Sequence, residues 1–165
     1  MRKIWLLPLL LILALPVAAQ KKHKSEDVTP EGQRSASNAH SFMELFSKLE
    51  RDWASAALKK DEVSLDAFLA PEFNERDANN PDRTITRLEW MKASLQDYRL
   101  DPLSIRSMSI RAFIASAVVS FVQKETTMPS DAGRCGNYFI VDVWVINHDK
   151  WQVASRTLSC ATCKN

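Results

Sequence analysis

The sequence predicts an α+β domain in which helices come first and a sheet of long antiparallel strands follows. Three observations predict it. Apolar residues recur at helical spacing in three segments before residue 100. After residue 102 the pattern changes to runs rich in Val, Ile, Phe and Ser, which is typical of strands. Turn signals separate these runs, so we expect one curved sheet with the helices on a single face.

The first nineteen residues have the pattern of a secretory signal peptide. Arg2 and Lys3 form a basic start, residues 4–17 are apolar, and residues 17–19 offer a small-residue cleavage site. An uncleaved membrane anchor is the alternative. The apolar segment is short against the ~20 residues of a spanning helix and contains two prolines. We therefore expect cleavage after Ala19 and a secreted or periplasmic protein.

The chain that remains after cleavage is electrically neutral. Loss of Arg2 and Lys3 takes the formal charge from +2 to zero. We therefore expect neither nucleic acid nor, after cleavage, a membrane as a partner. Residues 20–40 are polar, mixed in charge and free of large apolar side chains. They are predicted to form a flexible linker before one domain at residues 41–160.

The first predicted helix spans residues 41–60. Ser41 and Glu44 form a capping-box pattern at its start. One face of this helix carries six apolar or small residues, namely Phe42, Phe46, Leu49, Trp53, Ala56 and Ala57.

Two further helices are predicted before the strands. Asp61 is the expected cap of a short second helix, which Pro71 ends. The polar segment at residues 71–85 is expected to carry one short strand at most. Thr86 and Glu89 form another capping box, which begins the third helix.

The last two strands form a predicted hairpin, near residues 137–147 and 150–159. A two-residue turn at His148-Asp149 would place Asn147 opposite Lys150. Continued without a break, this register puts Asp142 opposite Ser155, on the face that also carries Trp144 and Trp151. Arg156 then lies on the other face and reaches Asp142 only if the strand contains a bulge.

Both faces of this hairpin are largely apolar, so both need cover. We expect helices on one face and propose a second subunit, as in a homodimer, on the other. Asp142 then has two interpretations. It is either a structural group satisfied by Ser155 or an arginine, or a neutral carboxylic acid that donates a hydrogen bond to a ligand.

Three cysteines lie near the end of the chain: Cys135, Cys160 and Cys163. A disulfide is expected in an exported protein. The hairpin register makes Cys160 the diagonal neighbour of Cys135 on the same face, whereas Cys163 falls on the other face. We expect Cys135–Cys160, with Cys160–Cys163 as the alternative. The three cysteines do not predict a metal site, because a structural zinc site needs four ligands.

Three stretches of the chain resemble the nuclear-transport-factor-2-like superfamily, which includes SnoaL-like domains and ketosteroid isomerases. They are "LERDWASAALKKDEVSLDAFLAPEF", "RTITRLEWMKASL" and "YFIVDVWVINHDKWQVASRTLS". The resemblance implies a cone-shaped antiparallel sheet that wraps around three N-terminal helices, with an apolar pocket at the open end.

The resemblance also implies candidate site residues. Ketosteroid isomerases use an aspartate base and an aspartic acid, and these positions fall on Asp77 and Asp142. Trp53 falls where those enzymes have a tyrosine, and indole has no hydroxyl to share a proton with Asp142. The implied ligand contacts are Trp53, Trp90, Tyr138 and Trp144. The alternatives are a solvated turn for Asp77 and core positions for the tryptophans.

Three functions are therefore considered. The first is an exported single-domain protein that binds a small, partly apolar ligand without catalysis. The second is a cofactor-independent isomerase, cyclase or dehydratase that uses Asp77 as base and Asp142 as acid. The third is a non-catalytic dimerisation module. No cofactor is expected for any of them.

Overall fold

The computed structural model describes residues 30–125 and 135–161. Three helices and six strands lie within these ranges: α1 (Pro30–Lys59), α2 (Glu62–Phe68), β1 (Leu69–Asp77), β2 (Asn80–Thr86), α3 (Arg87–Asp97), β3 (Arg106–Ala112), β4 (Ser116–Lys124), β5 (Asn137–Asn147) and β6 (Lys150–Cys160). The predicted signal peptide, the first part of the predicted linker and Cys163 lie outside the described residues.

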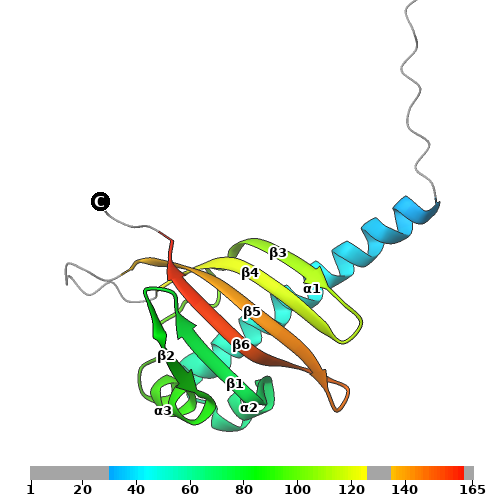
Figure 1. The fold of residues 1–165 in the computed structure, drawn as a ribbon. Coiled ribbons are helices and arrows are strands. Elements are labelled where there is room, and N and C mark those ends of the chain that lie inside the picture. The colour runs from blue at the N-terminus through cyan, green and yellow to red at the C-terminus, as the bar shows by residue number, and fades with distance from the viewer. Residues whose placement is uncertain (1–29, 126–134, 162–165) are drawn as a thin grey trace, which may run out of the picture.

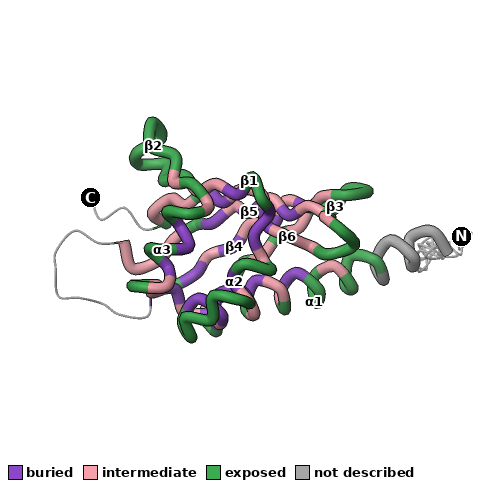
Figure 2. Tube along the Cα trace, turned by 90° about the horizontal axis from the view of Figure 1, so that it is seen from below, coloured by how far each residue is buried: buried purple, intermediate pink, exposed green. Residues whose placement is uncertain are grey.

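All six described strands form one open sheet in the order β2-β1-β6-β5-β4-β3. Figure 1 shows α1 crossing this sheet, with α2 and α3 beside the β1–β2 end. The view from below in Figure 2 places α1 and α2 along one side of the strands. The predicted α+β class, with the helices on a single face of the sheet, is confirmed.

The polar segment at residues 71–85 differs from its prediction. It contributes parts of both β1 and β2, which pair as an antiparallel hairpin, and β1 also runs parallel to β6. The sheet is therefore mixed rather than a simple antiparallel meander. β2 is an edge strand whose residues are almost all exposed. An edge strand in water needs few apolar residues, so composition alone did not reveal it.

Helix α1 begins at Pro30 and not at residue 41. Its first turns, blue in Figure 1, project beyond the sheet. The prediction of a flexible linker up to residue 40 is therefore wrong for residues 30–40. Ser41 and Glu44 lie inside the helix and do not cap it. Proline is a favoured first helical residue, and that signal precedes the capping-box pattern in the chain.

The buried face of α1 is the predicted apolar face with one polar addition. Phe46, Trp53 and Ala57 are buried as expected, and Phe42 and Leu49 pack against them. Glu50 is only 1% exposed. It lies four residues after Phe46, so it occupies the same helical face and points into the core.

The predicted caps of the other two helices are confirmed. The side chain of Asp61 accepts a hydrogen bond from the backbone nitrogen of Ser64 at 3.1 Å. Thr86 and Glu89 form the complete capping box of α3. These caps satisfy backbone donors that have no partner within a helix and so define where α2 and α3 begin.

The β5–β6 hairpin turns at His148 and Asp149, as predicted. Both residues have positive φ, 48° and 61°, as a tight two-residue hairpin turn requires. Asn147 pairs with Lys150, and Trp144 pairs with Val153. The first part of the predicted register is therefore confirmed.

Beyond Trp144 the predicted register is wrong. Val143 pairs with Ser155, so Ala154 is an extra residue in β6 and forms a β-bulge. Asp142 consequently pairs with Arg156 instead of Ser155. The bulge moves Arg156 from the outer face to the inner face of the sheet, next to the helices.

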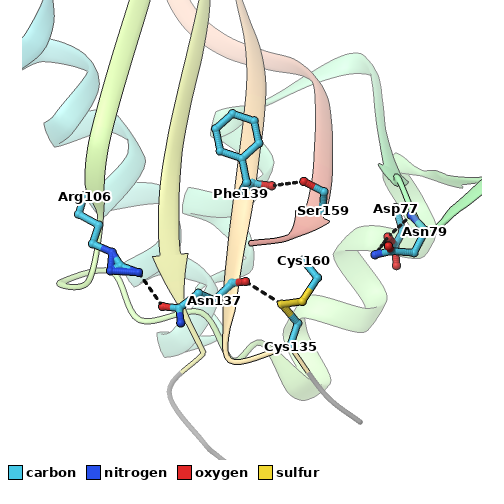
Figure 3. The surroundings of a disulfide bond; sticks show 8 residues. All are labelled: Asp77, Asn79, Arg106, Cys135, Asn137, Phe139, Ser159 and Cys160. Atoms are coloured by element: carbon cyan, nitrogen blue, oxygen red, sulfur yellow. Dashed lines mark hydrogen bonds between the residues drawn. A yellow bond between two sulfur atoms is a disulfide. The ribbon is translucent and has the colours of Figure 1, made fainter. Parts of the chain in front are cut away.

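The disulfide joins Cys135 to Cys160, as predicted, with 5.5 Å between their Cα atoms. Figure 3 shows that it links the segment before β5 to the end of β6. The link therefore ties together the two strands at the centre of the sheet, where Cys160 pairs with Tyr138, a residue that lines the cavity described below.

Candidate functional site

An open cavity of about 380 Å³ lies between α3, the segment after it and the inner face of the sheet. Its apolar walls are contributed by Ile85, Trp90, Tyr98, Leu100, Tyr138 and Leu158. Its polar groups include Glu75 and Asp77 from β1 and Arg156 from β6. An apolar cavity of this size with a few polar groups is typical of a small-molecule site.

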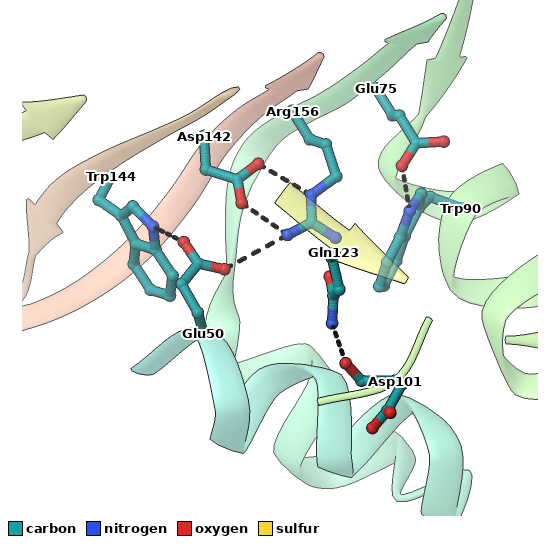
Figure 4. A network of polar contacts seen from close by, with 8 residues as sticks. All are labelled: Glu50, Glu75, Trp90, Asp101, Gln123, Asp142, Trp144 and Arg156. Carbon is teal, nitrogen blue, oxygen red and sulfur yellow. Dashed lines mark hydrogen bonds and ion pairs between the residues drawn. The ribbon is translucent and has the colours of Figure 1, made fainter. Parts of the chain in front are cut away.

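Arg156 is the centre of a buried ionic network beneath this cavity (Figure 4). Its Nε donates to Asp142 Oδ1 at 2.8 Å, and its Nη2 donates to Asp142 Oδ2 at 2.5 Å. Nη2 also lies 3.3 Å from Glu50 Oε2. The guanidinium carbon stands 3.7 Å from the ring centre of Trp53. These contacts combine a two-point ion pair with a cation–π contact.

Glu50 supplies the second carboxyl group of the network. Its Oε1 accepts a hydrogen bond from the indole nitrogen of Trp144 at 2.7 Å. Burial, followed by the nearby carboxylate of Asp142, raises the pKa of Glu50 well above its usual range. Burial therefore disfavours the ionised form of Glu50, although its Oε2 lies within ion-pair distance of Arg156.

The charge on Arg156 is fixed by its surroundings. Burial alone lowers the pKa of the guanidinium, but Asp142, Tyr98 and Glu50 together outweigh this effect and raise that pKa above its usual value. Two of the three guanidinium nitrogens, Nε and Nη2, are bound to carboxyl oxygens. Arg156 thus stays positively charged, and two of its three guanidinium nitrogens already donate hydrogen bonds within the protein.

Glu75 lines the cavity, and a neutral donor, the indole of Trp90, holds its carboxyl group. Its Oε2 accepts a hydrogen bond from the indole nitrogen of Trp90 at 2.8 Å. Burial raises the pKa of Glu75 to about 7, although Arg156 and the Trp90 hydrogen bond both act against that rise. Glu75 therefore exchanges its proton near neutral pH, unlike an ordinary surface glutamate.

Tyr98 remains a neutral phenol across the physiological range. Burial raises the pKa of its hydroxyl group to about 12, and Arg156 acts against that rise. Its ring packs edge-on against Trp90, with 6.3 Å between ring centres. Tyr98 therefore contributes apolar surface and a neutral hydroxyl group rather than a charge.

The two predicted catalytic aspartates occupy different environments. Asp77 lines the cavity but is exposed, and its Oδ1 accepts hydrogen bonds from the backbone and side-chain nitrogens of Asn79. Asp142 is 0% exposed, and Arg156 binds both of its oxygens. Asp142 has no surface that a ligand can reach, and the structure does not bring the two carboxylates together on one ligand atom.

The predicted ligand contacts divide into two groups. Trp90 and Tyr138 line the cavity. Trp53 and Trp144 are 1% and 0% exposed and belong to the hydrophobic core. Trp53 and Trp90 are nevertheless adjacent, with ring centres 5.3 Å apart. The aromatic core therefore continues into the wall of the cavity.

Sequence reasoning missed Glu50 and Glu75, and it placed Arg156 on the wrong face of the sheet. Glu50 follows Phe46 at helical spacing, and Glu75 follows Phe73 at strand spacing, so both shared a face with a buried aromatic residue. Those two signals were present in the sequence. Arg156 had no such signal, because its direction depends on the bulge at Ala154.

Residues 30–125 and 135–161 also bear on metal binding and on membrane crossing. No group of three or more His, Cys, Asp and Glu side chains there is arranged to hold a metal ion. Among the same residues, no helix combines the length and the apolar character that crossing a membrane requires.

No protein-family model and no curated protein matches the chain. Solved structures do match it. An NTF2-like protein from Cytophaga hutchinsonii is 16% identical, with a TM-score of 0.54 over 72% of this chain and 97% of that one. An NTF2-like protein of unknown function from Pseudomonas putida is 13% identical, with a TM-score of 0.58 over 76% and 91%.

The association domain of C. elegans CaMKII is also similar. It is 11% identical, with a TM-score of 0.59 over 74% of this chain and 98% of that domain. Identities this low establish a fold and not an activity. The curved sheet, the helices on its inner face and these three likenesses lead to one conclusion: the chain has the α+β cone fold of the nuclear-transport-factor-2-like superfamily.

Proposed function

We propose that this protein binds a small, partly apolar ligand in the cavity between α3 and the sheet. The observation that carries the proposal is the cavity itself, which combines about 380 Å³ of volume with aromatic walls and the interior carboxyl group of Glu75. Binding sites for small molecules have this composition, in which apolar surface supplies affinity and a few fixed polar groups supply orientation.

The surroundings of the cavity support binding rather than chemistry by the aspartate pair. Asp142 and Arg156 hold each other in a fixed geometry. Trp90 holds Glu75 in the same way. Groups fixed before a ligand arrives lower the entropy cost of binding. The isomerase-like alternative requires Asp142 to touch a ligand, and its zero exposure speaks against that role.

Native mass spectrometry of protein purified from its own host tests this function. We expect a retained small molecule on the wild type. Ala93 lines the cavity, so Ala93→Trp fills it and should abolish retention. Lys92→Trp adds the same side chain at an exposed neighbouring position that does not line the cavity and should leave retention unchanged. Equal retention by both variants would refute a ligand in this cavity.

The protein is also proposed to act outside the cytoplasm. The pattern of the first nineteen residues supports export. The Cys135–Cys160 disulfide is in keeping with it, since such bonds persist in oxidising compartments. N-terminal sequencing of exported material should find Gln20 as the first residue. A protein that retains Met1 in the membrane fraction would contradict cleavage and support an anchor.

Self-association is a second candidate function, and the outer face of the sheet favours it. The outer patch consists of six apolar residues on β4 and β5, all partly exposed: Val118, Val122, Phe139, Val141, Val143 and Val145. Val118 pairs with Val143, and Val122 pairs with Phe139, so the patch is continuous across both strands. A similar fold serves as the association domain named above. Continuous apolar patches of this kind often mark interfaces.

Sedimentation velocity tests this association. We expect a wild-type dimer and a monomer for Val143→Arg, because an arginine in the outer patch would be desolvated without a partner. Leu88→Arg is the control, since Leu88 is 79% exposed on α3 and is not part of the outer patch. A wild-type monomer at every protein concentration would refute this function without affecting the proposal on the ligand.

A further inference from the structure

Glu75 is placed to meet a ligand. It lies two residues after Phe73 and two before Asp77 along β1, so it shares a face with the buried Phe73, and its side chain lies on the inner face of the sheet. Trp90 binds Oε2, and Figure 4 shows the other carboxyl oxygen pointing away from that indole. Within residues 30–125 and 135–161, no lysine, arginine or histidine forms an ion pair with Glu75.

The charges around the cavity favour a cation. Arg156 is paired with Asp142, and Arg99 is paired with Asp97 at 2.5 Å. Each pair is locally neutral. The carboxyl group of Glu75 inside the cavity has no such cation. Its interior position makes the attraction for a positive ligand stronger than it would be in water.

The walls of the cavity suit a ligand whose cation is attached to an apolar body. Trp90, Tyr98 and Tyr138 line it with aromatic surface. Aromatic faces attract cations as well as apolar groups. An anionic ligand would have to approach Glu75, and the nitrogens Nε and Nη2 of Arg156 are already bound to Asp142 and Glu50.

We propose that the cavity selects small amines, and that Glu75 accepts the hydrogen bond and the charge of the ammonium group while the aromatic walls hold its apolar body. Trp90 is a positioning residue in this arrangement, because it fixes one oxygen of Glu75 and leaves the other for the ligand. This assignment rests on the proposed ligand-binding function and specifies its chemical class.

Calorimetric titration with three probes of nearly equal shape tests the assignment. The probes are phenethylamine, phenethyl alcohol and phenylacetate, which are cationic, neutral and anionic at neutral pH. At pH 8 we expect the amine to bind at least about tenfold more tightly than either of the others, because only the cation gains a buried ion pair.

The pH dependence of the wild type supplies a second readout. The amine remains protonated from pH 6 to pH 8, since its pKa resembles that of lysine, about 10.4. Glu75, with a pKa of about 7, is mostly protonated at pH 6 and mostly ionised at pH 8. Amine affinity should therefore rise about tenfold from pH 6 to pH 8.

Glu75→Gln should lose the preference for the amine and its pH dependence. Its amide oxygen can still accept the Trp90 hydrogen bond, so the wall of the cavity is preserved. Glu72→Gln is the matched control, because it removes the same charge from an exposed position on the same strand. It should bind like the wild type.

The outcomes separate the two levels of the proposal. If the alcohol or phenylacetate binds as tightly as the amine, or if no probe binds, the amine assignment is overturned. The same holds if Glu75→Gln binds the amine like Glu72→Gln. A retained molecule that is lost from Ala93→Trp would still establish ligand binding in the cavity. Absence of any retained molecule, together with no probe binding, would overturn both.

Discussion

Arg156 is the single cation of the interior network, and its position determines the role of its neighbours. Both oxygens of Asp142 are committed to it, and Glu50 completes its environment from α1. A buried charge is stable only while its partner is present. Asp142 therefore acts as a structural anchor between β5 and β6, and its place among tryptophans reflects the packing around the ion pair.

Replacement of Asp142 by Asn should destabilise the protein strongly. The variant keeps the shape of the side chain but leaves the buried guanidinium of Arg156 with Glu50 as its remaining carboxyl partner, and burial disfavours the ionised form of Glu50. We expect the free energy of unfolding, measured by urea denaturation at pH 7, to fall by about 3 kcal/mol. Asp149→Asn, which removes the same charge from the exposed turn of the same hairpin, is the control.

A loss no greater than that of Asp149→Asn would contradict this account. It would mean that the protein tolerates a buried Arg156 without the negative charge of Asp142. The ligand-contact interpretation of Asp142 would then need to be considered again, in spite of the burial of that side chain.

Glu75 should make stability depend on pH near neutrality. Its pKa is raised from 4.5 in the unfolded chain to about 7 in the fold, so the folded protein holds the proton more tightly. The stabilisation is complete below about pH 4.5 and is lost as the pH rises through 7. Glu75→Gln cannot lose a proton, so its stability relative to the wild type should increase between pH 5 and pH 8.

Urea denaturation of both proteins at several pH values from 5 to 8 measures this difference. Glu50 also has a raised pKa, but it is present in both proteins and cancels in the comparison. A difference in unfolding free energy that stays constant over this range would show that burial does not perturb Glu75.

At the level of single elements, local chemistry determines where the helices begin. The α3 helix starts at a reciprocal pair of contacts, in which Glu89 Oε2 accepts from the backbone nitrogen of Thr86 at 2.8 Å and Thr86 Oγ1 accepts from the backbone nitrogen of Glu89. This start places Trp90 one turn into the helix, facing Glu75. The cap therefore supports the wall of the cavity.

Thr86→Ala should cost about 1 kcal/mol of unfolding free energy, because it leaves a donor at the start of α3 without its partner. Thr84→Ala, on the exposed strand β2, should cost at most about 0.5 kcal/mol. Chemical denaturation of the two variants in parallel provides the comparison. Equal losses would indicate that β-strand propensity, and not the cap, accounts for the effect.

Apart from the start of α1 at Pro30, elements set by local signals were predicted from the sequence, whereas the bulge set by the sheet was not. The caps at Asp61 and Thr86 and the turn at His148 each depend on a few adjacent residues. The bulge at Ala154 has no such signature, because it reflects how β6 fits against β5 and β1 together. One unpredicted residue was sufficient to reverse the side of the sheet on which Arg156 lies.

At the scale of the whole molecule, the residues of the candidate site also divide into those that the sequence predicted and those that it did not. Trp90 and Tyr138 were identified from the sequence and line the cavity. Glu75 was overlooked because its polar segment was expected to carry one short strand at most, whereas β1 is one of the strands that form the inner face. The family resemblance predicted the cone, its pocket and Asp77 at the edge of that pocket, but not Glu75 or Arg156.

The disulfide is a covalent constraint on the two central strands of the sheet. It closes a loop of 25 residues that contains all of β5 and β6. In a Cys163→Ser background, which prevents exchange with the third thiol, Cys135→Ser with Cys160→Ser should lower the unfolding free energy by about 3 kcal/mol. Urea denaturation measures the loss, and a change below about 1 kcal/mol would mean that the hairpin alone already restrains the unfolded chain.

The parallel pairing of β1 with β6 has a consequence for the order in which the molecule can fold. Leu69 lies beside Val153, so this contact joins positions about eighty residues apart in the chain. Contacts between such distant positions slow folding, since a long loop must close before the pairing stabilises it. Until β6 has been synthesised, the β1–β2 hairpin has no partner strand, and Glu75 has no cavity to line. During synthesis the cavity is therefore among the last parts of the protein to form.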